Sequence, residues 1–224
     1  MPTNRKTIFA NGEIYHIFNR GVEKRPTFTS RREYTRAAET FSYYRFVKPP
    51  YRFSHFVRLA KDIRSTVLKN LNSSAKQIEI LAFCLMPNHF HFLLRQVAVN
   101  GISKFAANFT NSYTKYFNTL NDRVGPLFQG AFKAVHIESD EQLMHVSRYI
   151  HLNPVSSFII EADELEAYEW SSYPEYISKE ESDVIEKHTI LELFSNKVEL
   201  YRHFVLGYAD YARKLENIKH LLLE

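Results

Sequence analysis

The chain has a single cysteine, no long apolar run and no repeated or low-complexity segment. One cysteine, Cys84, excludes an intrachain disulfide, and its place in an apolar run is typical of a buried thiol. No uninterrupted apolar stretch is long enough to cross a bilayer. The polar amino terminus lacks the apolar core of a secretory signal. We therefore expect a soluble cytoplasmic protein with no membrane partner.

Hydrophobic residues make up 45% of the 224 residues and aromatic residues 15%, which is ample for a buried core. Charged residues make up 24% and are mixed in sign, so wholesale disorder is not indicated. The formal net charge is +4. This favours a polyanionic partner only weakly, because many proteins are this basic without binding nucleic acid.

Alternating apolar residues and turn signals predict four strands, at residues 13–18, 78–85, 89–95 and 127–137. Helical spacing predicts helices at residues 30–44, 101–120 and 139–153, with a short helix at 63–71 and helical patterns at 189–194 and 197–215. Ser139 and Gln142 form a capping-box pattern, and Pro154 disfavours helix just before it. The order predicts an α+β fold, a ferredoxin-like split βαβ arrangement with a central antiparallel sheet and a C-terminal helical extension.

Two histidines, His89 and His91, lie on either side of Phe90 in the apolar run Met86–Leu94. On a strand both imidazoles share one face, while Phe90 points into the core. Two imidazoles on a rigid strand make half of a divalent-metal site. Taken alone, the triplet favours the alternative, two strand histidines with hydrogen-bond partners.

A second constellation follows on the helix that Ser139 opens. Tyr149 and Asn153 are four residues apart, so they share one helix face, and His145 lies one turn earlier on the same stripe. A metal site that cuts a phosphodiester needs a nucleophile, a cation and ligands for that cation. Asn153 could supply a carbonyl oxygen and Tyr149 the attacking phenol. The alternative is a half-buried tyrosine and a helix-ending asparagine.

Other tyrosines compete for the role of nucleophile. Tyr113 and Tyr116 have Phe117 and Leu120 four residues on, so neither is paired with a possible ligand. Both also lie on or beside the apolar stripe of their helix, where a core or edge position is expected. Tyr149 therefore ranks first among them.

The blocks Met86–Leu94 and Tyr149–Val155 resemble two signature blocks of the single-tyrosine HUH transposases. The match is closest to the REP-associated tyrosine transposase branch of the IS200-like family. Lesser blocks agree, namely Tyr15–Gly21, Gly125–Gln129 and Trp170–Tyr173. The resemblance covers roughly residues 10–177, and both main blocks occur in the expected order.

The resemblance implies a ferredoxin-like enzyme that cleaves and rejoins single-stranded DNA beside a hairpin, such as a repeat end or REP-like element. Tyr149 would be the nucleophile that forms a 5′-phosphotyrosine. His89, His91 and Asn153 would hold Mg²⁺ or Mn²⁺, and imidazole ligands favour manganese. Relatives work as monomers or as homodimers, and both states stay open for this chain.

The family often carries an arginine where this chain has Ala131, so a phosphate contact is either missing here or supplied by Lys133. A positively charged funnel with aromatic faces is the physical requirement for single-strand binding. The candidate residues for it are Arg20, Lys24, Arg25, Arg123 and Lys133, with Arg31, Arg32 and Lys115 as further basic residues on the same elements. We expect the transposase domain at 1–177, with 48–74 as a possible insertion and 178–224 as the helical extension.

Three other functions fit parts of the pattern. A non-cleaving module of the same fold would bind the hairpin only, although a decayed copy would usually lose a histidine or the tyrosine. An HUH replication initiator or relaxase is generally longer than 224 residues. A hydrolytic metalloenzyme would leave Tyr149 and Asn153 without a role. We therefore expect a strand-transferring transposase.

Overall fold

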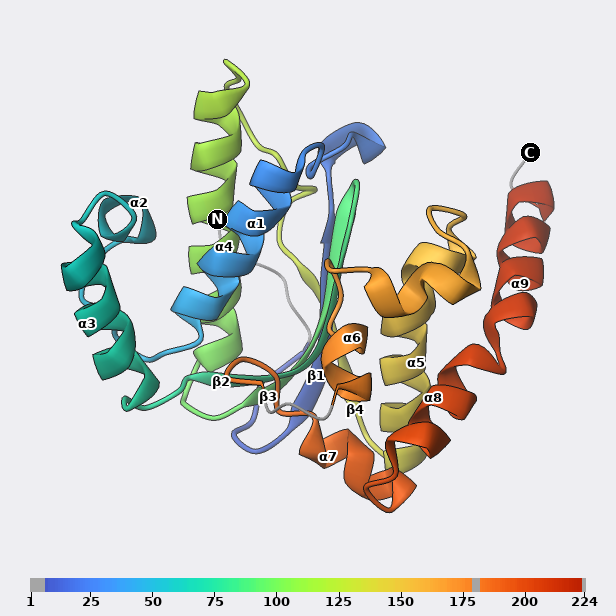
Figure 1. The fold of residues 1–224 in the computed structure, drawn as a ribbon. Helices are drawn as coiled ribbons and strands as arrows, with labels where there is room; N and C mark the ends of the chain where they lie inside the picture. The colour runs from blue at the N-terminus through green and yellow to red at the C-terminus, as the bar shows by residue number, and fades with distance from the viewer. Residues whose placement is uncertain (1–6, 179–181, 223–224) are drawn as a thin grey trace. The chain divides into compact units, whose positions relative to one another are not determined.

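A computed structural model describes residues 7–178 and 182–222, the last six as backbone alone (Figure 1). Its strands are β1 (Ile14–Arg20), β2 (Ile78–Met86), β3 (His89–Gln96) and β4 (Lys133–Ile137). Its α-helices are α1 (Arg31–Tyr44), α2 (Phe53–Phe56), α3 (Lys61–Asn72), α4 (Gly101–Leu120), α5 (Asp140–Ser156), α6 (Tyr173–Ile177), α7 (His188–Leu191), α8 (Val198–Leu206) and α9 (Ala209–Leu222). Short 3-10 helices are η1 (Val22–Lys24), η2 (Ala162–Ala167) and η3 (Glu192–Phe194).

The four strands form one antiparallel sheet in the order β2-β3-β1-β4. Together with α1 and α4 they follow the chain order strand–helix–strand–strand–helix–strand. This confirms the expected ferredoxin-like arrangement. No helix in the described part of the chain is both long and apolar enough to span a membrane.

The chain divides into two compact units, each assembled from separate segments. Among the described residues, the first contains 7–79, Pro87–His89 and Leu94–His136, and the second contains Ile80–Met86, Phe90–Leu93, 137–178 and 182–222. The first unit includes α1 to α4, and the stretch 48–74 folds there as α2 and α3. The second includes α5 to α9.

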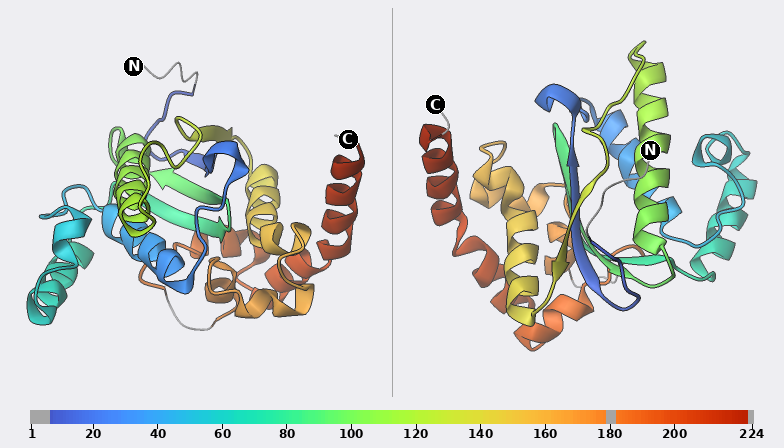
Figure 2. Two further views of the ribbon diagram at one scale, coloured as in Figure 1. Left: turned by 90° about the horizontal axis from the view of Figure 1, so that it is seen from above. Right: turned by 180° about the vertical axis from the view of Figure 1, so that it is seen from behind.

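In the first unit α1 and α4 pack side by side, as both views of Figure 2 show. Ser30 caps α1, because its hydroxyl accepts a hydrogen bond from the Glu33 backbone N–H. The apolar stripe of α4 is buried: Phe105, Phe109 and Tyr113 are all fully enclosed. Apolar stripes on the two helices therefore hold this layer together.

The expected strand at 127–137 is too long, because only Lys133–Ile137 is strand. Gly130 has a φ of 59°, a left-handed conformation that breaks the extended run just before β4. Phe128 instead forms an isolated antiparallel bridge with Gly21 at the end of β1.

The expectation that the helix opened by Ser139 ends near Asn153 is wrong, since α5 continues to Ser156 with Pro154 inside it. Proline at this position removes only one N–H from the last turn. The next N–H groups still bond, Ser157 to the Asn153 carbonyl at 3.0 Å and Phe158 to the Val155 carbonyl at 3.1 Å.

At its start, α5 has the predicted cap. The Ser139 hydroxyl accepts from the Gln142 backbone N–H at 3.2 Å. The Gln142 side chain accepts from the Glu138 N–H at 2.8 Å, one residue before the position that a standard capping box uses.

The helical pattern expected at 197–215 is two helices in the structure, α8 and α9, separated at Gly207 and Tyr208.

A buried histidine, His151, ties α5 to its neighbours in the second unit. Its Nδ1 lies 2.7 Å from the Tyr201 hydroxyl of α8 and its Nε2 lies 2.8 Å from the Ser172 hydroxyl. The Tyr201 hydroxyl donates onward to Ser147 of α5. The Tyr201 hydroxyl therefore accepts a hydrogen bond from Nδ1 of His151. A neutral imidazole that carries its proton on Nδ1 satisfies the network.

We predict that His151 makes the protein sensitive to acid. Burial lowers the pKa of His151 to about 3, from its ordinary value of 6.5. Between these values the unfolded chain binds a proton that the folded chain does not. The contribution of neutral His151 to the free energy of unfolding is therefore complete above pH 6.5. As the pH falls from there toward about 3, this contribution is lost at about 1.4 kcal/mol per pH unit.

Urea unfolding of the protein and of His151→Gln between about pH 7 and pH 4 measures this effect. Glutamine can keep a donor and an acceptor but does not titrate, so the variant is less stable at pH 7 and loses stability less steeply below 6.5. Equal slopes for the two proteins would show that His151 is not the group responsible.

Candidate functional site

Strand β3 carries the two histidines at alternate positions, so they share one strand face as predicted. Phe90 and Phe92 point the other way and are fully buried. The Nδ1 of His89 lies 2.6 Å from the Asn88 side-chain oxygen. This acceptor favours the proton on Nδ1, and a neutral imidazole then presents Nε2 as the metal-ligating atom.

The turn before His89 is held by the segment that follows β1, within the first unit. Gly21 N–H donates to the Asn88 carbonyl at 2.8 Å, and Thr27 N–H donates to the Pro87 carbonyl at 2.7 Å. A Cβ at Gly21 would overlap the Arg25 carbonyl oxygen, so glycine is required for this close approach. The basic segment after β1 therefore lies beside the first histidine.

In the second unit, His91 meets the candidate nucleophile. The rings of His91 and Tyr149 are edge to face, with centroids 5.5 Å apart and an interplanar angle of 84°. His91 is only 5% exposed, whereas Tyr149 is 48% exposed. A buried imidazole thus contacts a phenol that solvent and substrate can reach.

Asn153 lies one turn after Tyr149 on α5 and is nearly buried. Its side-chain nitrogen donates to the Tyr149 carbonyl at 3.2 Å. This hydrogen bond uses the nitrogen of the Asn153 amide. A cation would instead bind the oxygen of the same amide. The helix therefore positions Tyr149 and Asn153 together, as their spacing predicts.

The rival tyrosines are in unsuitable places. Tyr113 is fully buried, and its hydroxyl donates to the Thr27 carbonyl at 2.6 Å. Burial raises the pKa of Tyr113 far above its ordinary value, which disfavours the phenolate that attacks phosphorus. Tyr116 is partly buried, and the Arg36 guanidinium lies over its ring, 4.8 Å from the ring centre. Of the three tyrosines considered, Tyr149 is the exposed one, and it contacts His91 of β3.

A cation here would depend on nitrogen and amide ligands. Within residues 7–178 and 182–216, no three His, Cys, Asp or Glu side chains come together as a metal site. The Asn153 amide would therefore have to supply the oxygen ligand beside the imidazoles. Such a donor set suits a borderline cation such as Mn²⁺ better than Mg²⁺, which prefers oxygen.

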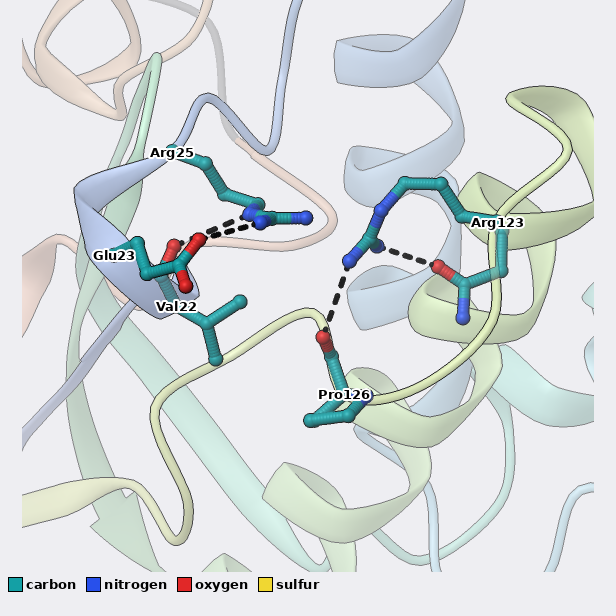
Figure 3. Close-up of polar contacts among 6 residues, drawn as sticks. Val22, Glu23, Arg25, Arg123 and Pro126 are labelled. Atoms are coloured by element: carbon teal, nitrogen blue, oxygen red, sulfur yellow. Dashed lines mark hydrogen bonds and ion pairs between the residues drawn. The ribbon is translucent and has the colours of Figure 1, made fainter.

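The five candidate DNA-binding residues all lie in the first unit, and the structure divides them into two groups. Arg25 pairs with Glu23 at 2.7 Å and donates to the Val22 carbonyl (Figure 3). Arg123 donates to the Asn118 side chain at 2.8 Å and to the Pro126 carbonyl at 3.4 Å. These two guanidinium groups hold their own loops in place.

The other three, Arg20, Lys24 and Lys133, are exposed. Arg20 ends β1, and its carbonyl accepts from the Gln129 N–H at 2.8 Å, which joins two of the lesser sequence blocks. Lys24 has a φ of 59° next to the turn that carries His89, and Lys133 begins β4. These side chains are the better placed of the five to meet phosphate.

Sequence reasoning missed a cavity of about 220 Å³ beside Tyr149, between α5 and α9. Arg148, on its wall, stacks between Phe204 at 4.2 Å and Tyr208 at 3.8 Å. Its guanidinium also lies 2.8 Å from Nδ1 of His145. Only tertiary structure brings these residues together, because the C-terminal helices lie outside the recognisable sequence blocks.

Comparison with known proteins decides the family. The sequence pattern described as "Transposase IS200 like" matches residues 38–153, slightly more than half of the chain and including both histidines, Tyr149 and Asn153. The chain belongs to the IS200-like transposase family. No curated protein matches this transposase.

Among solved structures, this transposase is similar to a REP-associated tyrosine transposase bound to a REP hairpin. The TM-score is 0.50 at 13% identity, over 79% of this chain and 86% of that one, and the likeness supports the fold. A candidate transposase from Deinococcus radiodurans R1 is 13% identical over 67% of this chain and 95% of its own, with a TM-score of only 0.28.

Proposed function

We propose that this transposase nicks and rejoins single-stranded DNA beside a hairpin, with Tyr149 as the nucleophile. The observation that carries the proposal is the edge-to-face contact between the buried His91 and the exposed Tyr149. Membership of the IS200-like family supports it, as does the hairpin bound by the structurally similar REP-associated transposase.

In the proposed first step, the Tyr149 oxygen attacks phosphorus and the bond from phosphorus to the upstream 3′ oxygen breaks. The phenol loses its proton, the leaving oxygen gains one, and a 5′-phosphotyrosine and a 3′-hydroxyl result. A later attack by a 3′-hydroxyl on the same phosphorus releases Tyr149. One phosphodiester bond is exchanged for another at each step, so no nucleotide cofactor is needed.

His89, His91 and Asn153 would hold a divalent cation. Bound there, Mn²⁺ or Mg²⁺ would polarise the scissile phosphate and favour the phenolate. The residues themselves position the reaction: α5 presents Tyr149 and Asn153 on one face, and the His91 edge fixes the phenol ring. We further propose that Arg20, Lys24 and Lys133 contact the DNA backbone, because exposed cations bind phosphate without reading sequence.

The direct test uses a labelled DNA hairpin with single-stranded flanks, incubated with the protein and Mn²⁺. A denaturing gel should show a covalent protein–DNA adduct together with a shortened strand that ends in a 3′-hydroxyl. A hairpin that shifts on a native gel and never forms the adduct would identify a binding module instead.

We predict that Tyr149 acts on the active site of its own chain, because His91 and Tyr149 of one chain are already in contact. Mixing Tyr149→Phe protein with His91→Ala protein should then give no more adduct than either variant alone. If each subunit instead placed its Tyr149 in the active site of the other, a dimer of one chain of each variant would contain one intact site of two, so about half of its sites would be restored. Adduct formation by the mixture would contradict the prediction.

A further inference from the structure

A basic groove with a volume of about 620 Å³ opens between α1, α2 and α4 of the first unit. Four cationic side chains line it and no carboxylate does, namely Arg36, Arg52, Arg58 and Lys115. A second hollow of about 410 Å³ shares Arg36 and Tyr116 with the groove. It adds two further arginines, Arg31 and Arg32, and one carboxylate, Glu39. The positive charge therefore continues beyond the groove itself.

Over the described ranges, none of the four cations of the basic groove forms an ion pair, in contrast to Arg25 with its Glu23 partner. The carboxylate of Glu39 acts on Arg36 electrostatically from the neighbouring hollow. Arg58 donates from Nε to the Ser54 carbonyl at 3.0 Å, which fixes its side chain without cancelling its charge. Like charges gathered in a concave surface raise the local positive potential and attract a polyanion.

Arg36 is held at the centre of this surface. Its guanidinium carbon lies 4.5 Å from the ring centre of Phe53 on α2 and 4.8 Å from that of Tyr116 on α4. Its Nε is buried and makes no hydrogen bond with any part of the chain that the structure describes. The two rings hold Arg36 in place, and its charge adds to that of the groove that it lines.

The α4 wall of the groove carries a stripe of polar side chains. Asn108, Ser112, Lys115 and Thr119 follow one another at spacings of four, three and four residues, so they form a single stripe. The neighbouring stripe, with Phe109 and Tyr113, is buried. The polar stripe offers amide, hydroxyl and ammonium donors to phosphate oxygens, and Tyr116 adds an aromatic ring to the same wall.

We propose that the basic groove binds the phosphate backbone of the single-stranded DNA that flanks the hairpin. This inference rests on the proposed function, because it assigns a place to one part of that substrate. Tyr44 and Tyr116 also line the groove. Cations that follow the backbone beside aromatic rings are typical of single-strand sites, because the bases of a single strand are free to stack.

The test measures binding without cleavage, in protein that carries Tyr149→Phe. Arg52→Ala with Lys115→Ala removes two exposed groove cations, and Lys69→Ala with Lys104→Ala removes two exposed lysines outside the groove. Fluorescence anisotropy follows two probes, an unstructured oligothymidylate and a blunt hairpin without flanks. Thermal melting of both double variants checks that they fold.

The groove variant should bind oligothymidylate roughly 10-fold more weakly at low salt. Its slope of log K against log salt should fall by about 1.4, because each phosphate contact on a single strand contributes about 0.7. Its affinity for the blunt hairpin and the control variant's affinity for both probes should not change. Unchanged oligothymidylate binding overturns the inference, and so does a loss confined to the blunt hairpin.

Adduct formation separates this inference from the proposed function. If the unsubstituted protein forms no adduct while the groove variant loses oligothymidylate binding, the proposed strand-transfer function is wrong and DNA binding by the basic groove is supported. If the adduct forms and the groove variant binds like the control, only the groove is wrong.

Discussion

Replacing Tyr149 with phenylalanine should abolish the covalent protein–DNA adduct and lower strand cleavage by roughly 10⁴-fold or more. The substitution removes the oxygen that we propose attacks phosphorus and keeps the ring that packs against His91. Hairpin binding should fall by less than about 3-fold, since phosphate contacts dominate affinity. A labelled hairpin with flanks, run on denaturing and native gels, measures both quantities.

Tyr211→Phe is the matched control for this prediction. Tyr211 lies on α9 and is 53% exposed, close to the 48% of Tyr149, so both substitutions remove one accessible phenol. The control should cleave like the unsubstituted protein. An adduct that survives Tyr149→Phe would assign the nucleophile to another side chain and leave α5 without its proposed role.

Replacing either histidine of β3 should have the second largest effect. His91→Ala and His89→Ala each remove one proposed imidazole ligand, and we expect each to lower Mn²⁺-dependent cleavage by about 10³-fold. Calorimetric titration of the DNA-free protein with Mn²⁺ should show weaker binding for both variants. This second measurement does not depend on catalysis.

The exposed His203 of α8 supplies the control, because His203→Ala removes an imidazole far along the chain from β3. His91 is buried, so its truncation also leaves a cavity. His91→Leu fills most of that space without any ligating atom, and it should lose cleavage as fully as His91→Ala. Full Mn²⁺ affinity in folded His91→Leu protein would exclude His91 as a ligand.

Local patterns predicted the elements that carry the site. Alternation around Phe90 placed both histidines on one face of β3, and the cap at Ser139 began α5 at the right residue. These features depend on neighbours only a few residues away, which is why the sequence reveals them. The spacing of Tyr149 and Asn153 is likewise a local feature, because the two residues lie one helical turn apart.

Features that depend on long-range packing were not predictable in this way. The run at 127–137 alternates like a strand, but the left-handed Gly130 and the bridge from Phe128 to Gly21 shorten it. Pro154 is tolerated because it falls in the last turn of α5. Both outcomes depend on where the surrounding chain runs, and single-residue propensities carry no such information.

The sequence offered Arg31, Arg32 and Lys115 as basic residues but did not reveal the basic groove as one surface, nor the cavity beside Tyr149, and the reason is the same for both. The basic groove combines Arg36 of α1, Arg58 next to α2 and Lys115 of α4, which are up to 79 residues apart in the chain. The stretch 48–74 has no clear periodicity, so its arginines offered no signal of a shared site. The cavity beside Tyr149 similarly needs α9 to pack against α5.

The most direct test of the central claim is to locate the covalent bond. After cleavage of a hairpin substrate, digestion with nuclease and trypsin leaves a nucleotide on the peptide that begins after Arg148 and ends at Lys179. Fragmentation by mass spectrometry should place that nucleotide on Tyr149. A nucleotide on Tyr168, Tyr173 or Tyr176 of the same peptide, or on any other peptide, would contradict the account.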